Sequence, residues 1–292
     1  MSIEIVRAII EGTHLAVYSS IKPGGVHRLR LDIEAHALMS SCISVLDYIV
    51  KAIELGESVK KGNLAATSIN LGNLYARALR EAYRWLGRNV RSDVIVPSIT
   101  NALILSYTEP ESVIEEAGNL RKALNIFING TKWRDVREFI NALRSVGEEE
   151  KVTHLQDTGI TYSQALAEGV NLGEAFNSLS SKWPGFIAVN PRETLVFDMV
   201  KKLMEYYRYY KEPNNAIIRL YIDLISPRIP SWAKELFDKA IENKLMATKE
   251  GGKLLFEIDL KLRKSGYIYD NYIPLLIAIT QLAVYEGLRP TY

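Results

Sequence analysis

The sequence predicts an all-α protein that folds as a single globular domain of about ten to twelve packed helices over residues 1–292. Apolar residues recur at three-to-four spacing in most segments, and no segment shows the alternation of a half-buried strand. Gly and Pro divide these segments into lengths near the ~11 to 12 residues of an average helix. With 48% hydrophobic and 24% charged residues, the chain can bury a substantial core.

The predicted helices follow one another with short connections. Residues 2–20 repeat apolar positions at helical spacing, with Glu4 in the first turn. From Asp32 to about Leu55 the apolar residues cover more than one face, which predicts a central, buried helix that Gly56 stops. Residues 152–159 have poor helical periodicity. The other predicted helices span 66–86, 93–107, 109–129, 133–146, 161–179, 191–210, 214–224, 231–246, a segment around 257–263, and 271–287.

Composition narrows the function classes. The chain has 36 Lys and Arg residues and 34 Asp and Glu residues, a formal net charge of +2. Its overall electrostatic field therefore does not favour binding to nucleic acid or to an anionic membrane. Cys42 is the only cysteine, which excludes an internal disulfide. No stretch approaches the ~20 apolar residues of a membrane span, and we expect a cytoplasmic protein. Sparse Gln with abundant Ile, Tyr, Lys and Glu favours a thermophilic source.

One short stretch, residues 22–30 (KPGGVHRLR), interrupts the helical N-terminal region. Pro23 restricts the backbone, and the two glycines allow positive φ or a close approach to a ligand. Backbone N–H groups at Gly24 and its neighbour, beside cationic side chains, form a combination that holds phosphate. A solvated basic turn would have the same composition, so both interpretations stay open. The cationic side chains are Lys22, Arg28 and Arg30.

A second stretch with useful side chains precedes the predicted helix at 161–179. His154 and Asp157 could each serve as a general base, a metal ligand or a hydrogen-bond partner. Asp157 or Thr158 could equally cap the helix that begins near Tyr162. Both interpretations of Asp157 stay open.

Four fragments resemble, in order and approximate spacing, the motifs of one known family. The first is the Lys-Pro-Gly-x-Val-x-Arg segment that begins at Lys22, followed by Asp32 and a long apolar helix. On these motifs the chain resembles the triphosphoribosyl-dephospho-CoA synthase family over most of its length. The other three fragments are Asn70-Leu71-Gly72, Asp223-Leu224-Ile225-Ser226-Pro227-Arg228 and Ile258-Asp259-x-x-Leu262-Arg263.

The resemblance implies a transferase that moves the triphosphoribosyl group of ATP to a ribose hydroxyl of dephospho-CoA and releases adenine. It implies ATP as a substrate and Mg²⁺ as a cofactor, because the triphosphate needs cationic partners and the hydroxyl needs a base. Phosphate and nucleotide binding would fall to Lys22, Gly24, Arg28, Arg30 and Asn70. Asp32 and Asp223 would be metal ligands or the general base, with Asp157 as a further candidate for the base.

The chain departs from the family pattern in two places. The family's Asn-Pro-Gly-Thr segment is replaced by residues 267–274, and no lysine follows Arg228. These departures motivate an alternative, a catalytically altered or inactive helical relative that binds a nucleotide, another phosphorylated ligand or a protein partner. An enzyme that acts on another phosphorylated substrate is a third interpretation, so enzymatic activity itself is open. We expect small nucleotides as partners, and a homo-oligomer is compatible with the sequence.

Overall fold

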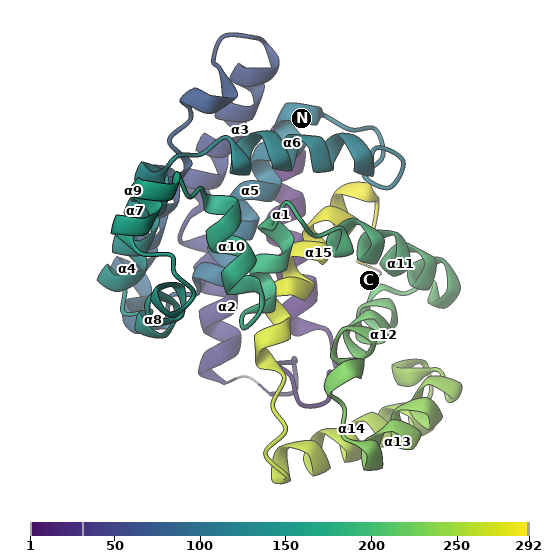
Figure 1. Cartoon of the computed structure of the whole chain (residues 1–292). Helices are drawn as coiled ribbons and strands as arrows, with labels where there is room; N and C mark the ends of the chain where they lie inside the picture. Colours follow the sequence, from purple (N-terminus) through teal and green to yellow (C-terminus); the bar gives the residue numbers. More distant parts are fainter. Residues whose placement is uncertain (1, 31, 291–292) are drawn as a thin grey trace.

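The computed structural model describes residues 2–30 and 32–290, with the backbone alone at Tyr162 (Figure 1). Within these ranges it contains fifteen α-helices, short 3-10 segments and no β-strand, so the predicted all-α class is confirmed. The α-helices are α1 Ser2–Tyr18, α2 Ile33–Ile43, α3 Leu46–Lys60, α4 Leu71–Leu86, α5 Ser92–Thr108, α6 Ala117–Asn129, α7 Trp133–Ser145, α8 Glu149–Asp157, α9 Tyr162–Glu168, α10 Leu172–Ser180, α11 Leu195–Tyr210, α12 Pro213–Ile225, α13 Ser231–Glu242, α14 Lys249–Lys264 and α15 Ile273–Glu286. Two 3-10 segments help to shape the site, η3 Pro184–Val189 and η6 Asp270–Tyr272.

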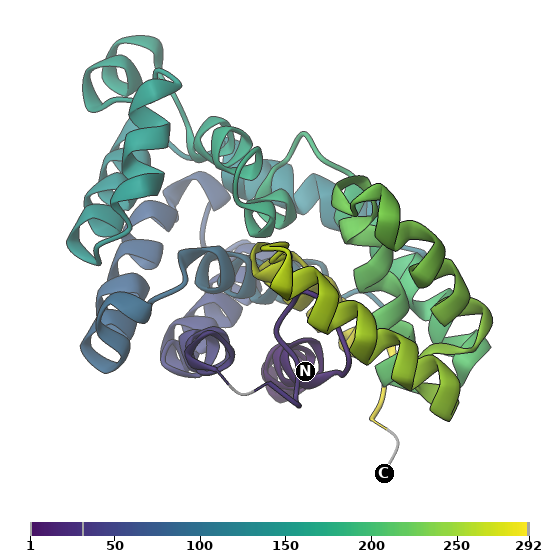
Figure 2. The ribbon, with the colours of Figure 1, turned by 90° about the horizontal axis from the view of Figure 1, so that it is seen from below.

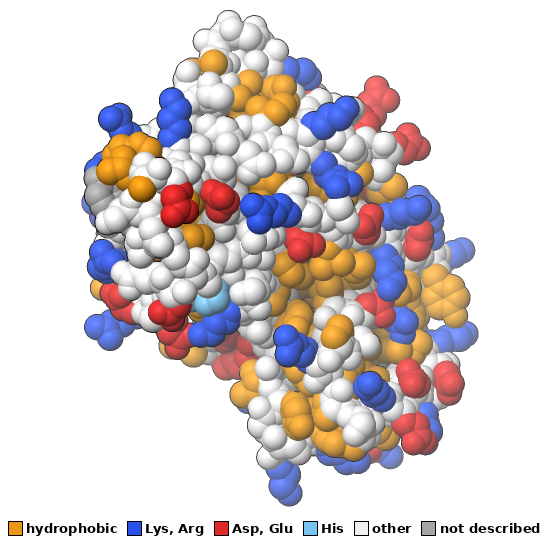
Figure 3. Space-filling model, viewed as in Figure 1, with side chains coloured by type: hydrophobic (Ala, Val, Ile, Leu, Met, Phe, Trp, Pro, Cys, Tyr) orange, Lys and Arg blue, Asp and Glu red, His pale blue; other side chains and the backbone are white. Residues whose placement is uncertain are grey.

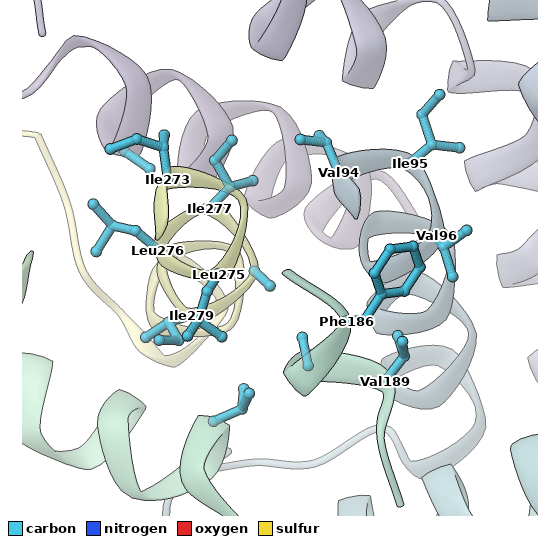
Figure 4. Close-up of a cluster of buried hydrophobic side chains, with 14 of the residues drawn as sticks. Val94, Ile95, Val96, Phe186, Val189, Ile273, Leu275, Leu276, Ile277 and Ile279 are labelled. Atoms are coloured by element: carbon cyan, nitrogen blue, oxygen red, sulfur yellow. The ribbon is translucent and has the colours of Figure 1, made fainter. Parts of the chain in front are cut away.

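Two helices that are apolar all round, α5 and α15, form the centre of the molecule. Every residue of α5 from Ser92 to Ser106 is buried, and so is α15 from Ile273 to Val284. Their side chains meet those of η3 in the cluster drawn in Figure 4. No described helix is long and apolar enough to cross a membrane. The neighbouring helices bury α5 and α15 on every side.

A buried amide network ties α1 to this centre. Gln281 donates to Thr13 Oγ1 at 3.0 Å and to Ser98 Oγ at 2.7 Å, and its Oε1 accepts from Asn101 at 3.0 Å. Gly12 lies against the backbone of Gln281, where a Cβ would come within 2.4 Å of the Gln281 Cα. Because buried amides need all their partners, this network fixes the register of α1 on α15.

The remaining helices cover the two flanks of the central pair. α4 and α7–α9 lie on one flank, and α11–α14 lie on the other (Figures 1 and 2). The loop between α1 and α2 crosses the lower end of the molecule in Figure 1, where the last turn of α14 and the start of α15 also lie. Residues distant in sequence therefore meet at this end.

The number of helices exceeds the predicted ten to twelve because two predicted helices are each divided in two and residues 149–157 form a further helix. The 32–55 segment is divided between α2 and α3 at Val45, which leaves helical geometry with φ −116° and ψ 19°. Gly56 does not stop α3, which continues to Lys60. It instead allows α3 to touch α5, since a Cβ at Gly56 would lie 2.1 Å from Ser106 Oγ.

The region 149–180 also differs from the prediction. Residues 149–157, where helical periodicity is weak, form α8 because Val152 and Leu155 are buried on one side. The predicted 161–179 helix is two helices, α9 and α10, separated at Gly169 with φ +70°. Thr161 caps α9 by accepting from Gln164 N, so neither Asp157 nor Thr158 is the cap.

Candidate functional site around the N-terminal loop

The loop that follows α1 is packed into the protein from Ser19 to His27, and only Arg28 to Arg30 are exposed. Asn214 of α12 holds its first part, since its side chain accepts from Ser20 N at 2.8 Å and donates to Ser20 O at 2.8 Å. Tyr221 of α12 donates to Pro23 O at 3.0 Å. The loop is therefore packed into the fold and is not a solvated turn.

Lys22 turns back beneath α1 and is fully buried. Its Nζ donates to Val17 O at 3.1 Å, to Ser19 Oγ at 3.0 Å and also to Ser19 O. Burial lowers the pKa of Lys22 well below its ordinary value, although the negative charge of Asp270 raises it in part. As placed, the amine satisfies carbonyl groups at the end of α1 and does not face solvent.

Both glycine N–H groups of the loop are used inside the protein. Gly24 N donates to Asp259 Oδ1 at 2.8 Å, and Gly25 N donates to Lys22 O at 2.9 Å. Gly24 has φ +75°, and a Cβ on it would lie 2.7 Å from the ring of Tyr269. The glycine is therefore required by backbone geometry and by close packing, and its N–H is not directed at a ligand.

Asp259 of α14 is the anchor of the loop. It is 3% exposed and accepts from Gly24 N and from Arg263 Nε at 2.9 Å, while His27 Nε2 lies 3.5 Å from its Oδ2. Arg263 also donates to Gly25 O. Burial raises the pKa of Asp259, but His27, Gly24 N and Arg263 together lower it by a larger amount. The pKa of this carboxyl group therefore lies below its ordinary value. The ionised form is thereby stabilised.

A second charged cluster lies at the start of α5. Arg91 donates from Nε and Nη2 to the two carboxylate oxygens of Asp93 at 3.1 and 2.9 Å, and it also pairs with Glu34 of α2. Glu148 accepts from Ser92 N at 3.1 Å and from Lys151 at 2.7 Å. Burial raises the pKa of Asp93, but Arg91 and Lys151 outweigh it and the net pKa is lowered.

Asp270, at the start of η6, connects the two clusters electrostatically. Burial raises its pKa; Arg263, Arg91 and Arg30 lower it in part, whereas Asp32 raises it. Its Oδ1 is buried and has no hydrogen-bond partner among the residues that the structure describes. A carboxyl group with a raised pKa and a free oxygen is suited to accept a proton.

The exposed part of the loop borders this arrangement. Arg30 pairs with Asp32, with 3.5 Å between Nε and Oδ2, and Asp32 caps α2 by accepting from Ala35 N at 3.2 Å. Arg28 lines a cavity of about 500 Å³ together with Glu212 and Asn214. Arg28 and Arg30 are thus the cations of the loop that a solute can reach.

The other three predicted site residues lie on other elements. Asn70 caps α4, accepting from Asn73 N at 2.9 Å, and borders a groove of about 710 Å³ between α3 and α4. Asp157 is exposed at the last residue of α8. Asp223 lies between α11 and α12, where it accepts from Tyr206 at 2.5 Å and pairs with Lys202 at 2.8 Å and Arg219 at 3.3 Å.

A magnesium site at Asp32 and Asp223 is not preformed. Each carboxylate already pairs with at least one cation, and in the described part of the chain no group of three or more His, Cys, Asp or Glu side chains could hold a metal ion. We therefore derive no step through Mg²⁺.

Asp259 was not among the predicted site residues, although it belongs to one of the motif fragments. The signal was present, because Leu255, Ile258 and Leu262 are apolar at helical spacing and Asp259 falls on the same face. Arg91 and Asp270 carried no comparable signal, since only the fold brings them beside the loop.

The fold and the loop define a class of protein, an all-α domain in which the penultimate helix closes an N-terminal Lys-Pro-Gly loop. No protein-family model and no curated protein sequence matches the chain. A solved structure from Archaeoglobus fulgidus, provisionally described as a triphosphoribosyl-dephospho-CoA synthase, matches 87% of this chain and 99% of its own, with a TM-score of 0.53 and 19% identity. At this identity the likeness establishes a shared fold.

Proposed function

We propose that the chain is a transferase similar to triphosphoribosyl-dephospho-CoA synthase, which moves the triphosphoribosyl group of ATP to dephospho-CoA and releases adenine. The observation that supports it best is the direct contact between two of the motif segments. Gly24 N meets Asp259 Oδ1 across 235 positions of sequence, and Arg263 binds Gly25 O in the same place. The likeness in fold to the Archaeoglobus protein is a second support.

In this proposal the exposed cations of the loop, Arg28 and Arg30, bind the triphosphate. Asp270 takes the proton of the attacking ribose hydroxyl as the new C1′–O bond forms and the bond from C1′ to adenine breaks. Adenine takes up a proton as it leaves. Asp32, partly exposed beside Arg30, is the alternative base. Lys22 and Gly24 support the loop from within, because both are buried.

The other predicted residues enter the proposal without an assigned step. Within the described part of the chain, Asn70, Asp157 and Asp223 form no hydrogen bond or ion pair with the loop, and each is engaged elsewhere or exposed on another element. A requirement for Mg²⁺ belongs to the same proposal and is tested by adding a chelator to the assay.

The test is chromatography for free adenine after the protein is incubated with ATP, Mg²⁺ and dephospho-CoA. We expect adenine only when dephospho-CoA is present, and a loss of at least about tenfold in rate for Asp270→Asn. Asp238→Asn, an exposed carboxylate on α13, is the matched control and should retain the rate. If the wild-type protein releases no adenine, the proposal is wrong.

A second candidate is a helical relative that binds ATP without turnover. It is favoured by the ion pairs of Asp32 and Asp223, because neither carboxylate is then preformed as a ligand of the metal that turnover would use. Isothermal titration with ATP distinguishes the two. Saturable binding that Arg28→Ala weakens, without adenine release, would support this candidate over the transferase.

A further inference from the structure

We propose that the chain forms a two-fold homodimer through the outward face of α1. Figure 2, in which N marks the start of α1, shows this helix nearly end-on at the lower edge of the helices drawn. Ile3 is 69% exposed on this face, and Ile10, two turns further on, is also partly exposed. Residues seven apart lie on the same side of a helix, so the two isoleucines form one apolar stripe.

The charges beside this stripe have an order that is complementary to itself. Glu4, Arg7, Glu11 and His14 follow at spacings of three, four and three, so the pattern is symmetric about residue 9. When two copies of α1 pack antiparallel about that point, Arg7 of each meets Glu11 of the other, and Glu4 meets His14. The same symmetry brings Ile10 of each copy near Ile10 of the other, because Ile10 lies one residue from the centre. A parallel pair would instead oppose like groups.

Arg7 and Glu11, the inner pair of this pattern, are not engaged elsewhere in the described chain. Arg7 and Glu11 are one turn apart, yet neither has an ion pair or a hydrogen bond within the residues that the structure describes. An arginine that precedes a glutamate by four residues is in the less favourable order for pairing within a helix. Both side chains are therefore available to a partner copy.

The surroundings of α1 set the strength of the association. Recesses lined by Pro110, Glu111 and Pro290 flank the helix. The helix has 17 residues, which is ~25 Å of contact length. A stable interface covers ~800 Å² on each partner, more than one helix face supplies. We infer a weak dimer that dissociates on dilution.

Sedimentation velocity over a hundredfold range of protein concentration tests the proposal. The wild-type chain should shift from monomer to dimer, and 0.5 M NaCl should weaken the shift. Arg7→Glu and Glu11→Arg should each raise the dissociation constant about tenfold or more, because like charges then face each other. The double variant Arg7→Glu/Glu11→Arg should restore dimerisation, since it exchanges the two members of each pair.

Lys239→Glu, a charge reversal on the exposed face of α13, is the matched control and should dimerise as the wild type does. Circular dichroism confirms that each variant is folded. A wild-type chain that is monomeric at every concentration would overturn the proposal. So would a dimer that neither single reversal weakens, or one that the double variant fails to restore, because the antiparallel pairing requires all three results.

Discussion

Two carboxylate clusters at different places in this molecule look alike as sets of side chains but differ in burial. Asp259 and Arg263 beneath the loop have side-chain exposures of 5% and 11%, whereas Asp223 and Lys202 between α11 and α12 have 17% and 39%. Asp259 also accepts a backbone N–H from a distant segment. Among the described residues, Asp223 is bound only by side chains of its own helix and the neighbouring one.

This difference shows that the partners of an ion pair and its burial together determine how much the pair contributes to stability. A buried charge that loses one partner keeps its full cost of desolvation, so Asp259 and Arg263 depend on each other and on the loop. A pair that water reaches is screened and contributes little. Figure 3 shows acidic and basic side chains interspersed over the face that it displays, which is typical of such solvated pairs. Four substitutions test this contrast between buried and solvent-exposed groups.

The largest effect is expected for Asp259→Ala. Removing the carboxylate leaves Gly24 N without its acceptor and Arg263 without its main partner, which should lower the free energy of unfolding by about 3–5 kcal/mol. Urea unfolding measures the change, and Asp238→Ala on the exposed face of α13 is the control. A loss no larger than that of the control would show that the cluster does not stabilise the fold.

Gly24→Ala should come next, at about 2 kcal/mol or slightly more, since φ is +75° and the new Cβ would press on Tyr269. Gly62→Ala is a close match, because Gly62 has φ +72° and nothing within 4 Å of its Cβ position. The difference between the two variants isolates the contact with Tyr269. If both variants lose the same stability in thermal unfolding, the contact with Tyr269 is unimportant.

Lys22→Met should cost about 1–2 kcal/mol near neutral pH, because the carbonyl groups at the end of α1 lose a donor. The pH dependence is the sharper test. The folded-state pKa of Lys22 lies below its unfolded value of ~10.4, so the unfolded chain binds more protons between the two. Wild-type stability should therefore rise with pH in that window and fall as pH drops through it. Lys22→Met should lack this pH-dependent part of the free energy of unfolding. If the variant and the wild type showed the same pH dependence of stability, the burial of a titrating amine at Lys22 would be contradicted.

Asp223→Asn should have the smallest effect, within about 1 kcal/mol, because its cation partners are partly exposed. Urea unfolding at low salt and at 0.5 M NaCl checks this, and the difference from wild type should shrink at high salt. The same variant tests the predicted catalytic role of Asp223. Retained adenine release would remove this residue from the reaction.

Local patterns predicted several elements well. α1, α7 and α15 begin and end within a few residues of the prediction, because amphipathic or apolar periodicity and flanking Gly or Pro residues are local properties. The break at Val45 and the continuation through Gly56 were not predicted, since both depend on what packs against the helix. The loop at 22–30 was located correctly as a distinctive segment, and its phosphate-binding role stays a prediction.

By itself the sequence determined the all-α class, the position of the loop and the apolar character of the last helix, because these follow from periodicity and from the backbone preferences of Gly and Pro. Only the tertiary structure decided that Lys22 turns inward, that Asp259 receives Gly24 N, and that Asp270 lies among three arginines. These outcomes depend on burial and on contacts between distant segments, which are more than two hundred residues apart for Gly24 and Asp259. No local pattern encodes such contacts, so the site became visible only in the folded chain.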